Sequence, residues 1–167
     1  MNRRGILSIS AMTAVGLAFL SGSAVSQQTL KEQLVGTWTI VSNDNVAPDG
    51  TKRQIFGANP KGIAFFDAGG HYSITVVRLD RAKYAINSFT EGIAEENKAT
   101  AQGTMTYFGT YAVSEADRTI AIRIDGSSFP NWNGVDQKRI VSITGDQLKL
   151  TAPVAFGTAE VVWKRVQ

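Results

Sequence analysis

The chain has no cysteine and a single histidine among its 167 residues. Without cysteine there is no disulfide framework, no thiolate ligand for zinc and no thiol nucleophile. The lone imidazole of His71 has neither a second imidazole nor a close-set group of acids with which to bind a metal. The sequence also lacks the Gly-x-Ser-x-Gly turn, the phosphate-binding loop, the His-Glu-x-x-His pair and the dinucleotide fingerprint. We therefore expect no metal and no cofactor, and no motif assigns a catalytic residue.

The chain has little net charge of either sign once the first residues are set aside. The whole chain carries 17 basic and 14 acidic residues, and two of the basic ones are Arg3 and Arg4. Residues 27–167 therefore carry a net charge close to zero, with no basic stripe or block. Nucleic acid is excluded as a partner on this ground. The sequence gives no indication of the oligomeric state.

Residues 1–26 have the pattern of a cleaved signal peptide. A positive start is followed by a mostly apolar stretch from Ile6 to Leu20 and by the small residues Ala24-Val25-Ser26. The stretch is too interrupted for a membrane span, although a retained anchor is the alternative. Asn2-Arg3-Arg4-Gly5-Ile6-Leu7 also fits the twin-arginine export signal. We expect a periplasmic or secreted domain of residues 27–167, with no stable membrane span after processing.

The mature chain is a succession of short apolar and alternating segments separated by turn residues, which is typical of β-strands. A capping box at Thr29 and Glu32 predicts one helical turn before the first strand, and acids in its first half favour a short helix over residues 90–101. For that helix we expect a crossover or lid role. The predicted strands are 38–42, 63–66, 72–77, 104–113, 119–124, 137–143, 147–151 and 158–165.

Eight strands joined mostly by hairpins favour an all-β fold that closes into an up-and-down antiparallel barrel. Closure removes the exposed sheet edges that an open arrangement would leave. A two-sheet sandwich is the alternative, but the sequential hairpins need no Greek-key crossing, and the first and last strands are both strongly β-forming. The expected domain is therefore a barrel with a helical turn before it and one short helix between the third and fourth strands.

Four motifs, in order along the chain, are similar to those of the bacterial lipocalin-like domain proteins, a calycin-like barrel family. They are 34–38 (Leu-Val-Gly-Thr-Trp), 59–62 (Asn-Pro-Lys-Gly), 107–111 (Tyr-Phe-Gly-Thr-Tyr) and 129–134 (Phe-Pro-Asn-Trp-Asn-Gly). Gly36-Thr37-Trp38 also resembles the opening of the first strand in lipocalins and fatty-acid-binding barrels. That resemblance implies that Trp38 closes the floor of the barrel under a basic residue near the chain end, either Arg165 or Lys164. It implies a fold and no reaction.

Candidate ligand contacts come from aromatic and polar side chains. Tyr107 and Tyr111 share one face of their strand and would give an apolar cavity its polar handles, unless they are core aromatics. Asn131 and Trp132 lie in an unusual loop that either contacts ligand or folds back as a plug.

Two arginines are further candidates. Tyr72 and Arg78 share a strand face, although Arg78 also fits a strand-exit ion pair with the nearby Asp80. Arg123 alternates with isoleucines at 120, 122 and 124, so it points into the barrel only if those isoleucines face outward. The phase of this strand stays open at this point.

The function that we expect is binding of a small apolar or amphipathic molecule inside the barrel. One alternative is a cofactor-free isomerase or cyclase that uses a tyrosine and an arginine in the barrel. A further alternative is an envelope structural or interaction protein with a filled barrel and an exposed apolar patch.

Overall fold

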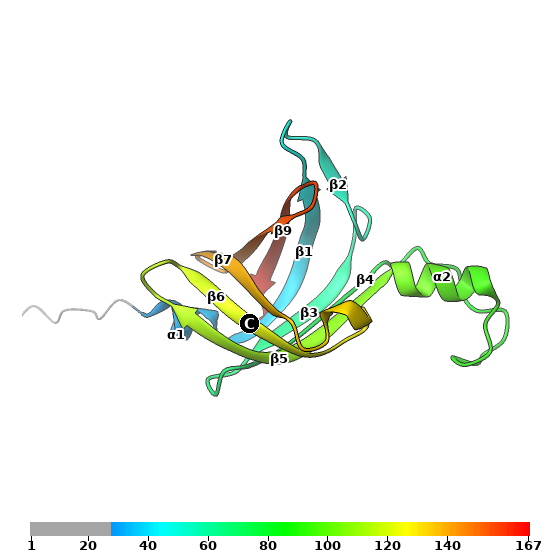
Figure 1. The fold of residues 1–167 in the computed structure, drawn as a ribbon, viewed down its shortest axis with the longest axis horizontal. Helices are drawn as coiled ribbons and strands as arrows, with labels where there is room; N and C mark the ends of the chain where they lie inside the picture. Colours follow the sequence, from blue (N-terminus) through cyan, green and yellow to red (C-terminus); the bar gives the residue numbers. More distant parts are fainter. Residues whose placement is uncertain (1–27) are drawn as a thin grey trace, which may run out of the picture.

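A computed structural model describes residues 28–167, and Figure 1 shows its arrangement. The expected signal peptide at 1–26 lies outside the described residues. Strands and helices follow one another in the order α1 (Leu30–Leu34), β1 (Gly36–Val46), β2 (Lys52–Gln54), β3 (Lys61–Phe66), β4 (His71–Val77), α2 (Ala94–Gln102), β5 (Thr104–Ser114), β6 (Thr119–Ser127), the 3-10 turn η1 (Pro130–Trp132), β7 (Asp136–Thr144), β8 (Gln147–Val154) and β9 (Gly157–Arg165).

Eight of the strands form a closed antiparallel barrel. Each strand from β3 to β9 pairs with the next, and β1 pairs with both β3 and β9, which closes the ring. The predicted all-β barrel is confirmed. The short β2 was not predicted, because its residues Lys52–Gln54 are all polar and exposed and show no alternation. It pairs only with the last three residues of β1, outside the ring.

Alternation along the strands places the apolar side chains inside. In β4 the buried residues are Tyr72, Ile74 and Val76, and in β8 they are Leu148, Leu150 and Ala152. Most of the core gathers toward the end of the barrel where β1 begins and β9 ends. Burial of these side chains contributes about 1.5 to 3 kcal/mol each.

Helix α1 closes that end of the barrel as a floor. The Thr29 hydroxyl accepts a hydrogen bond from the Glu32 amide, and the Glu32 carboxylate accepts one from the Thr29 amide, so the predicted capping box is present. Leu30 and Leu34 are buried against the core. The Glu115 carboxylate, in the turn after β5, accepts from the Leu30 amide at 2.7 Å and so joins α1 to the barrel.

Residues 78–103 form an arm that projects from the barrel between β4 and β5 (Figure 1). Its helix α2 begins four residues later than predicted, with Glu96 accepting from the Ile93 amide at its start. The arm points away from the barrel (Figure 1), so α2 connects β4 to β5 and does not cover the barrel in this arrangement, whereas the sequence left a crossover and a lid open. The Arg81 guanidinium fixes its base by donating to the Arg78 carbonyl oxygen and to the Thr104 hydroxyl. Within residues 28–167, neither α1 nor α2 has the length and apolar character of a membrane span.

Candidate functional site

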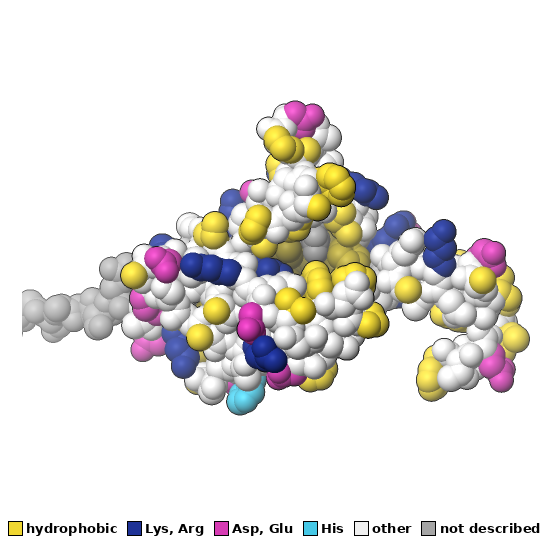
Figure 2. All heavy atoms as spheres, in the orientation of Figure 1, with side chains coloured by type: hydrophobic (Ala, Val, Ile, Leu, Met, Phe, Trp, Pro, Cys, Tyr) yellow, Lys and Arg dark blue, Asp and Glu magenta, His cyan; other side chains and the backbone are white. Residues whose placement is uncertain are grey.

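The half of the barrel away from the floor encloses a cavity of about 250 Å³. Its walls are mostly apolar and aromatic, and they come from six of the eight barrel strands together with η1 and the segment that follows β2. The lining residues are Asn43, Asn45, Ile55, Phe56, Ile74, Val76, Met105, Tyr107, Trp132, Arg139, Leu150, Val154, Ala159, Val161 and Trp163. In Figure 2 the hollow opens toward the viewer between hydrophobic walls.

A bulge in β1 turns two asparagines toward this cavity. Ile40 pairs with Trp163 while Ser42 pairs with Val162, so Val41 is an extra residue without a partner on β9. Such a bulge reverses the alternation that follows it. Asn43 and Asn45 consequently line the cavity and bring the only side-chain amides of its wall.

Two side chains from opposite sides partly cover the open end of the barrel. Phe56, which follows β2, is 6% exposed, and the Ile55 amide beside it donates to the Asn43 carbonyl oxygen at 3.2 Å. On the other side η1 carries Trp132, whose ring meets the rings of Tyr107 and Phe129 edge to face at 5.5 and 5.9 Å.

The barrel wall is incomplete between β7 and β8. These strands pair only from Ile140 and Thr151 toward the floor. Among the described residues, no strand pairs with the free edge of Asp136–Arg139 or with the facing edge of Ala152–Val154. We call this opening the notch. A second hollow of about 910 Å³ lies at the notch and shares Trp132, Arg139, Val154 and Ala159 with the inner cavity, so the two adjoin at these side chains.

Arg139 is the charged residue in the wall of the inner cavity. It lies on the inward face of β7, and its guanidinium donates to the Gln137 side-chain oxygen and, at 3.2 Å, to the Lys138 carbonyl oxygen. None of the ion pairs within residues 28–167 includes Arg139. Its charge therefore faces a mostly apolar space without a carboxylate partner.

A chain of aromatic rings runs down one wall from the notch. The Tyr107 ring meets that of Tyr72 at 5.9 Å, and Tyr72 stacks on Phe66 at 6.1 Å. Burial raises the pKa of the Tyr107 phenol, although the positive charge of Arg139 and its hydrogen bonding oppose that shift. The phenol is therefore neutral at pH 7 and serves as a hydrogen-bonding group.

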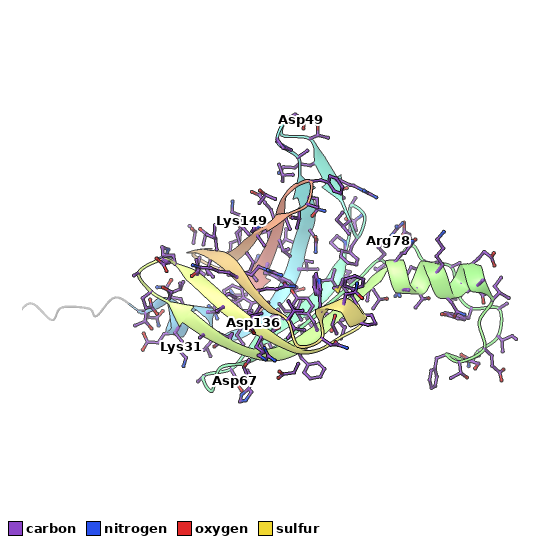
Figure 3. The ribbon with its side chains drawn as sticks, viewed as in Figure 1. Lys31, Asp49, Asp67, Arg78, Asp136 and Lys149 are labelled. Atoms are coloured by element: carbon purple, nitrogen blue, oxygen red, sulfur yellow. The ribbon has the colours of Figure 1, made fainter. Side chains whose placement is uncertain are left out.

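Five of the predicted contact residues lie away from the cavity, and the two arginines are among them. Ile120, Ile122 and Ile124 are buried, so Arg123 points outward from β6 and pairs with Asp136 at 3.2 Å. The inward orientation of Arg123, which the sequence left open, is therefore wrong, because the apolar face of β6 is the one that packs in the core. Arg78 pairs with Asp80 at 2.9 Å where the chain leaves β4, at the base of the arm (Figure 3).

The other three are two floor-side tyrosines and a loop asparagine. Tyr72 is buried, and its hydroxyl donates to the Arg123 carbonyl oxygen at 3.4 Å. Tyr111 lies below the cavity and donates to the Asp67 carbonyl oxygen at 2.6 Å. Asn131 is exposed on η1. Of the predicted contacts, Tyr107 and Trp132 are the two that line the cavity.

Sequence reasoning missed Arg139 and the two asparagines of β1. In Gln137-Lys138-Arg139-Ile140 the inward residues are polar and an outward one is isoleucine, which reverses the usual pattern. At a barrel mouth the inward positions meet solvent, so alternation loses its meaning there. The bulge at Val41 has no clear mark in the sequence.

Across the described part of the chain, no group of three or more His, Cys, Asp or Glu side chains has the geometry of a metal site. His71 pairs only with Asp67, at 3.1 Å, on the outer surface. Both side chains are more than half exposed, so this pair lies outside the cavity and away from its aromatic wall.

The closed ring and its cavity define a ligand-sized antiparallel β-barrel. The chain belongs to the lipocalin-like domain family, because the sequence model of that family matches residues 35–166. It is 29% identical over 85 residues to the 4'-hydroxy-3'-methoxypropiophenone carrier protein ppsC of Aspergillus oryzae, an alignment that covers 47% of this chain and 77% of that protein.

Solved structures that match this chain include these two. One is a lipocalin-like protein from Bacteroides uniformis, with 15% identity, a TM-score of 0.45, and coverage of 80% of this chain and 98% of the other. The second is the wild-type fluorescent protein UnaG, with 15% identity, a TM-score of 0.39, and coverage of 81% and 98%.

Proposed function

We propose that this barrel binds one small, mostly apolar molecule, carrying a polar or anionic end, in its inner cavity. The observation that carries the proposal is the cavity of about 250 Å³ with aromatic and aliphatic walls. An apolar cavity of about 150 Å³ is large enough for benzene. The resting cavity therefore suits a molecule with one substituted ring or two fused rings.

Arg139 gives the ligand its orientation. A guanidinium in a low-dielectric site favours an oxygen anion, to which it can donate two parallel hydrogen bonds. Because Arg139 lies where the inner cavity meets the notch, the anionic end of the ligand would face the notch and its apolar part the interior. Trp132 and Tyr107 would cover the faces of its ring.

The relative from Aspergillus oryzae supports binding without chemistry, because that protein is named a carrier of a substituted aromatic ketone. A carrier needs a cavity and a route into it, which the barrel offers through the notch. The barrel of the present chain is not filled by its own side chains, which argues against the filled-barrel alternative.

Binding of two matched probes tests this proposal. Naphthoate and its neutral amide share one ring system, and their binding is measured by calorimetry at neutral pH. We expect both to bind, with naphthoate about 10-fold tighter, because hydrogen bonds to charged groups are among the strong ones. Arg139→Met should remove that preference and leave the affinity for the amide unchanged.

Arg123→Met is the matched control, since it removes the same charge from the outer face of the neighbouring strand. It should keep the preference for naphthoate. Failure of both probes to bind to the wild-type protein would overturn the proposed function. An equal loss of preference in both variants would show that the net charge, and not Arg139 in the cavity, selects the anion.

We also propose that the protein is exported, with residues 1–26 removed. The support is the composition of that segment alone. Mass spectrometry of the protein recovered from the periplasm and medium of its own cells tests this: a chain that starts near residue 27 is expected. A full-length chain in the cytoplasm contradicts export, and the same spectra, recorded under native conditions, reveal any bound molecule.

A second candidate function rests on Tyr107 and Arg139, which line the same cavity. A neutral phenol beside a guanidinium could donate a proton to the oxygen of a ketone while solvent water takes the proton from the adjacent carbon, as in a keto–enol isomerisation. Exchange of the hydrogens next to the carbonyl of naphthyl methyl ketone in heavy water would reveal such activity by NMR. A rate that Tyr107→Phe leaves at the wild-type value would eliminate this candidate.

A further inference from the structure

Two buried tryptophans of the barrel differ in how their indole nitrogens are satisfied. Trp38 is 0% exposed and its Nε1 donates to the Leu34 carbonyl oxygen at 2.9 Å. Trp163 is 1% exposed, and its Nε1 has no hydrogen-bond partner among the described residues. The first indole is part of the floor, whereas the second lines the inner cavity.

The unpaired donor of Trp163 is costly in this position. A buried donor without an acceptor loses its hydration and gains nothing in return, so such groups are rare in folded proteins. The side chains beside Trp163 in the barrel are the apolar Ile40 and Leu148, its partners on β1 and β8. Neither side chain can accept a hydrogen bond, and the nitrogen itself has less than 1 Å² of open surface, so an acceptor in the cavity reaches it only through a small shift of the ring.

We infer that Trp163 Nε1–H donates to a neutral oxygen acceptor of the ligand, such as a ketone, ether or phenol oxygen, at its buried end. This inference rests on the proposed function, because it assigns a contact in the same cavity. A ligand held in this way is polar at its inner end as well as at the end that faces Arg139. Its apolar part lies between the two.

The spacing of the strands fits two polar contacts on one small molecule. Arg139 is next to Ile140 on β7. Ile140 pairs with Thr151 on β8, and Thr151 pairs with Glu160 on β9, so Arg139 lies close to the level of Glu160. Trp163 is three residues further along β9 toward the floor, about 10 Å at the usual rise of a strand. That separation matches the length of a fused two-ring molecule with one substituent.

The indole NMR signals of the three tryptophans test the inference. One probe is naphthyl methyl ketone, and its matched control is isopropenylnaphthalene, in which a methylene group replaces the carbonyl oxygen. We expect only the ketone to move the Trp163 Hε1 signal downfield, with signals assigned by single Trp→Phe variants. The Trp38 signal should stay unchanged with both probes, because its donor is already bonded to Leu34.

Affinity gives a second measurement. The ketone should bind about 2- to 10-fold tighter than the alkene, the range of a neutral hydrogen bond, and Trp163→Phe should remove that difference. A Trp163 signal that is downfield before any probe is added would mean that water or protein already accepts from it, which overturns the inference. So does tight binding of the ketone without a change in the Trp163 signal. Failure of both probes to bind overturns the proposed function and this inference with it.

Discussion

The guanidinium carbon of Arg165 lies 4.0 Å from the centroid of the Trp38 ring. Arg165 also donates to the carbonyl oxygens of Gln33 in α1 and of Val35, which follows α1. Trp38 is fully buried beneath it. Arg165 thus joins the last strand to the first by a cation–π contact and to the end of α1 by two hydrogen bonds.

Replacing Trp38 by alanine should lower the free energy of unfolding by about 3 to 5 kcal/mol, as for other buried large aromatics. The measurement is denaturant unfolding followed by circular dichroism. Trp132→Ala is the comparison, because Trp132 is only partly buried at the mouth. It should weaken ligand binding and change stability far less. A Trp38→Ala protein as stable as the wild type would mean that the floor is not where the barrel is held.

Gly36→Ala should destabilise the floor, and Gly50→Ala is the comparison at a positive φ without a neighbouring side chain. Both glycines have a positive φ, which an alanine adopts only with strain. At Gly36 an added Cβ would also lie 2.7 Å from Arg165 Nη1, whereas at Gly50 it meets open space. We expect Gly36→Ala to lose more free energy of unfolding than Gly50→Ala, by roughly 1 kcal/mol or more. Equal losses would show that neither the φ of 135° at Gly36 nor its contact with Arg165 adds a cost.

We expect ligand to enter and leave through the notch. Because the sequence has no cysteine, a single introduced thiol can be labelled to test this route. Lys138→Cys places a thiol at the notch, and Lys149→Cys places one on the outer face of the paired part of β8. Coupling a bulky maleimide polymer to Cys at 138 should slow both association and dissociation in stopped-flow fluorescence, while the same label at 149 should not. The equilibrium affinity should remain the same. Equal rates in the two labelled proteins would place the entrance elsewhere.

Stability should fall at alkaline pH because of the buried phenols. Burial raises the pKa of Tyr72, and likewise that of Tyr107, whereas an unfolded tyrosine titrates at about 10. Above that value the unfolded chain releases protons that the folded chain retains, so the free energy of unfolding decreases as the pH rises. Tyr72→Phe should make this decrease shallower in denaturant titrations between pH 9 and about 11. A slope that the substitution leaves unchanged would contradict the assignment.

The barrel could be predicted from the sequence because its strands alternate cleanly wherever both faces have distinct surroundings. Leu148 and Leu150 face the barrel interior, and the intervening Lys149 faces water, so the pattern is unambiguous. The turn of Asp67–Gly70 carries two glycines, which mark a hairpin between β3 and β4 equally clearly. Strand β2 escaped because three polar residues carry no period.

The candidate site was harder to predict, for reasons that lie in its position. Arg139 looks like a surface residue because the inner face of β7 changes from apolar to polar where the cavity begins. The asparagines of β1 reach the cavity only through the bulge at Val41, which depends on pairing with β9. Tyr107 and Trp132 were predicted from their aromatic character, and such residues serve cores and sites alike. Tyr111 was predicted on the same ground, but it is buried in the core and does not line the cavity.

The notch also has a mechanical consequence. Below Ile140 and Thr151 the wall is continuous and tied by interstrand hydrogen bonds, while above them β7 and β8 have separate edges. The upper part of β7 is therefore held along one edge only, by its pairing with β6. A molecule in the notch meets two strand edges that are not tied to each other, whereas the wall nearer the floor is closed by pairing on both sides of every strand.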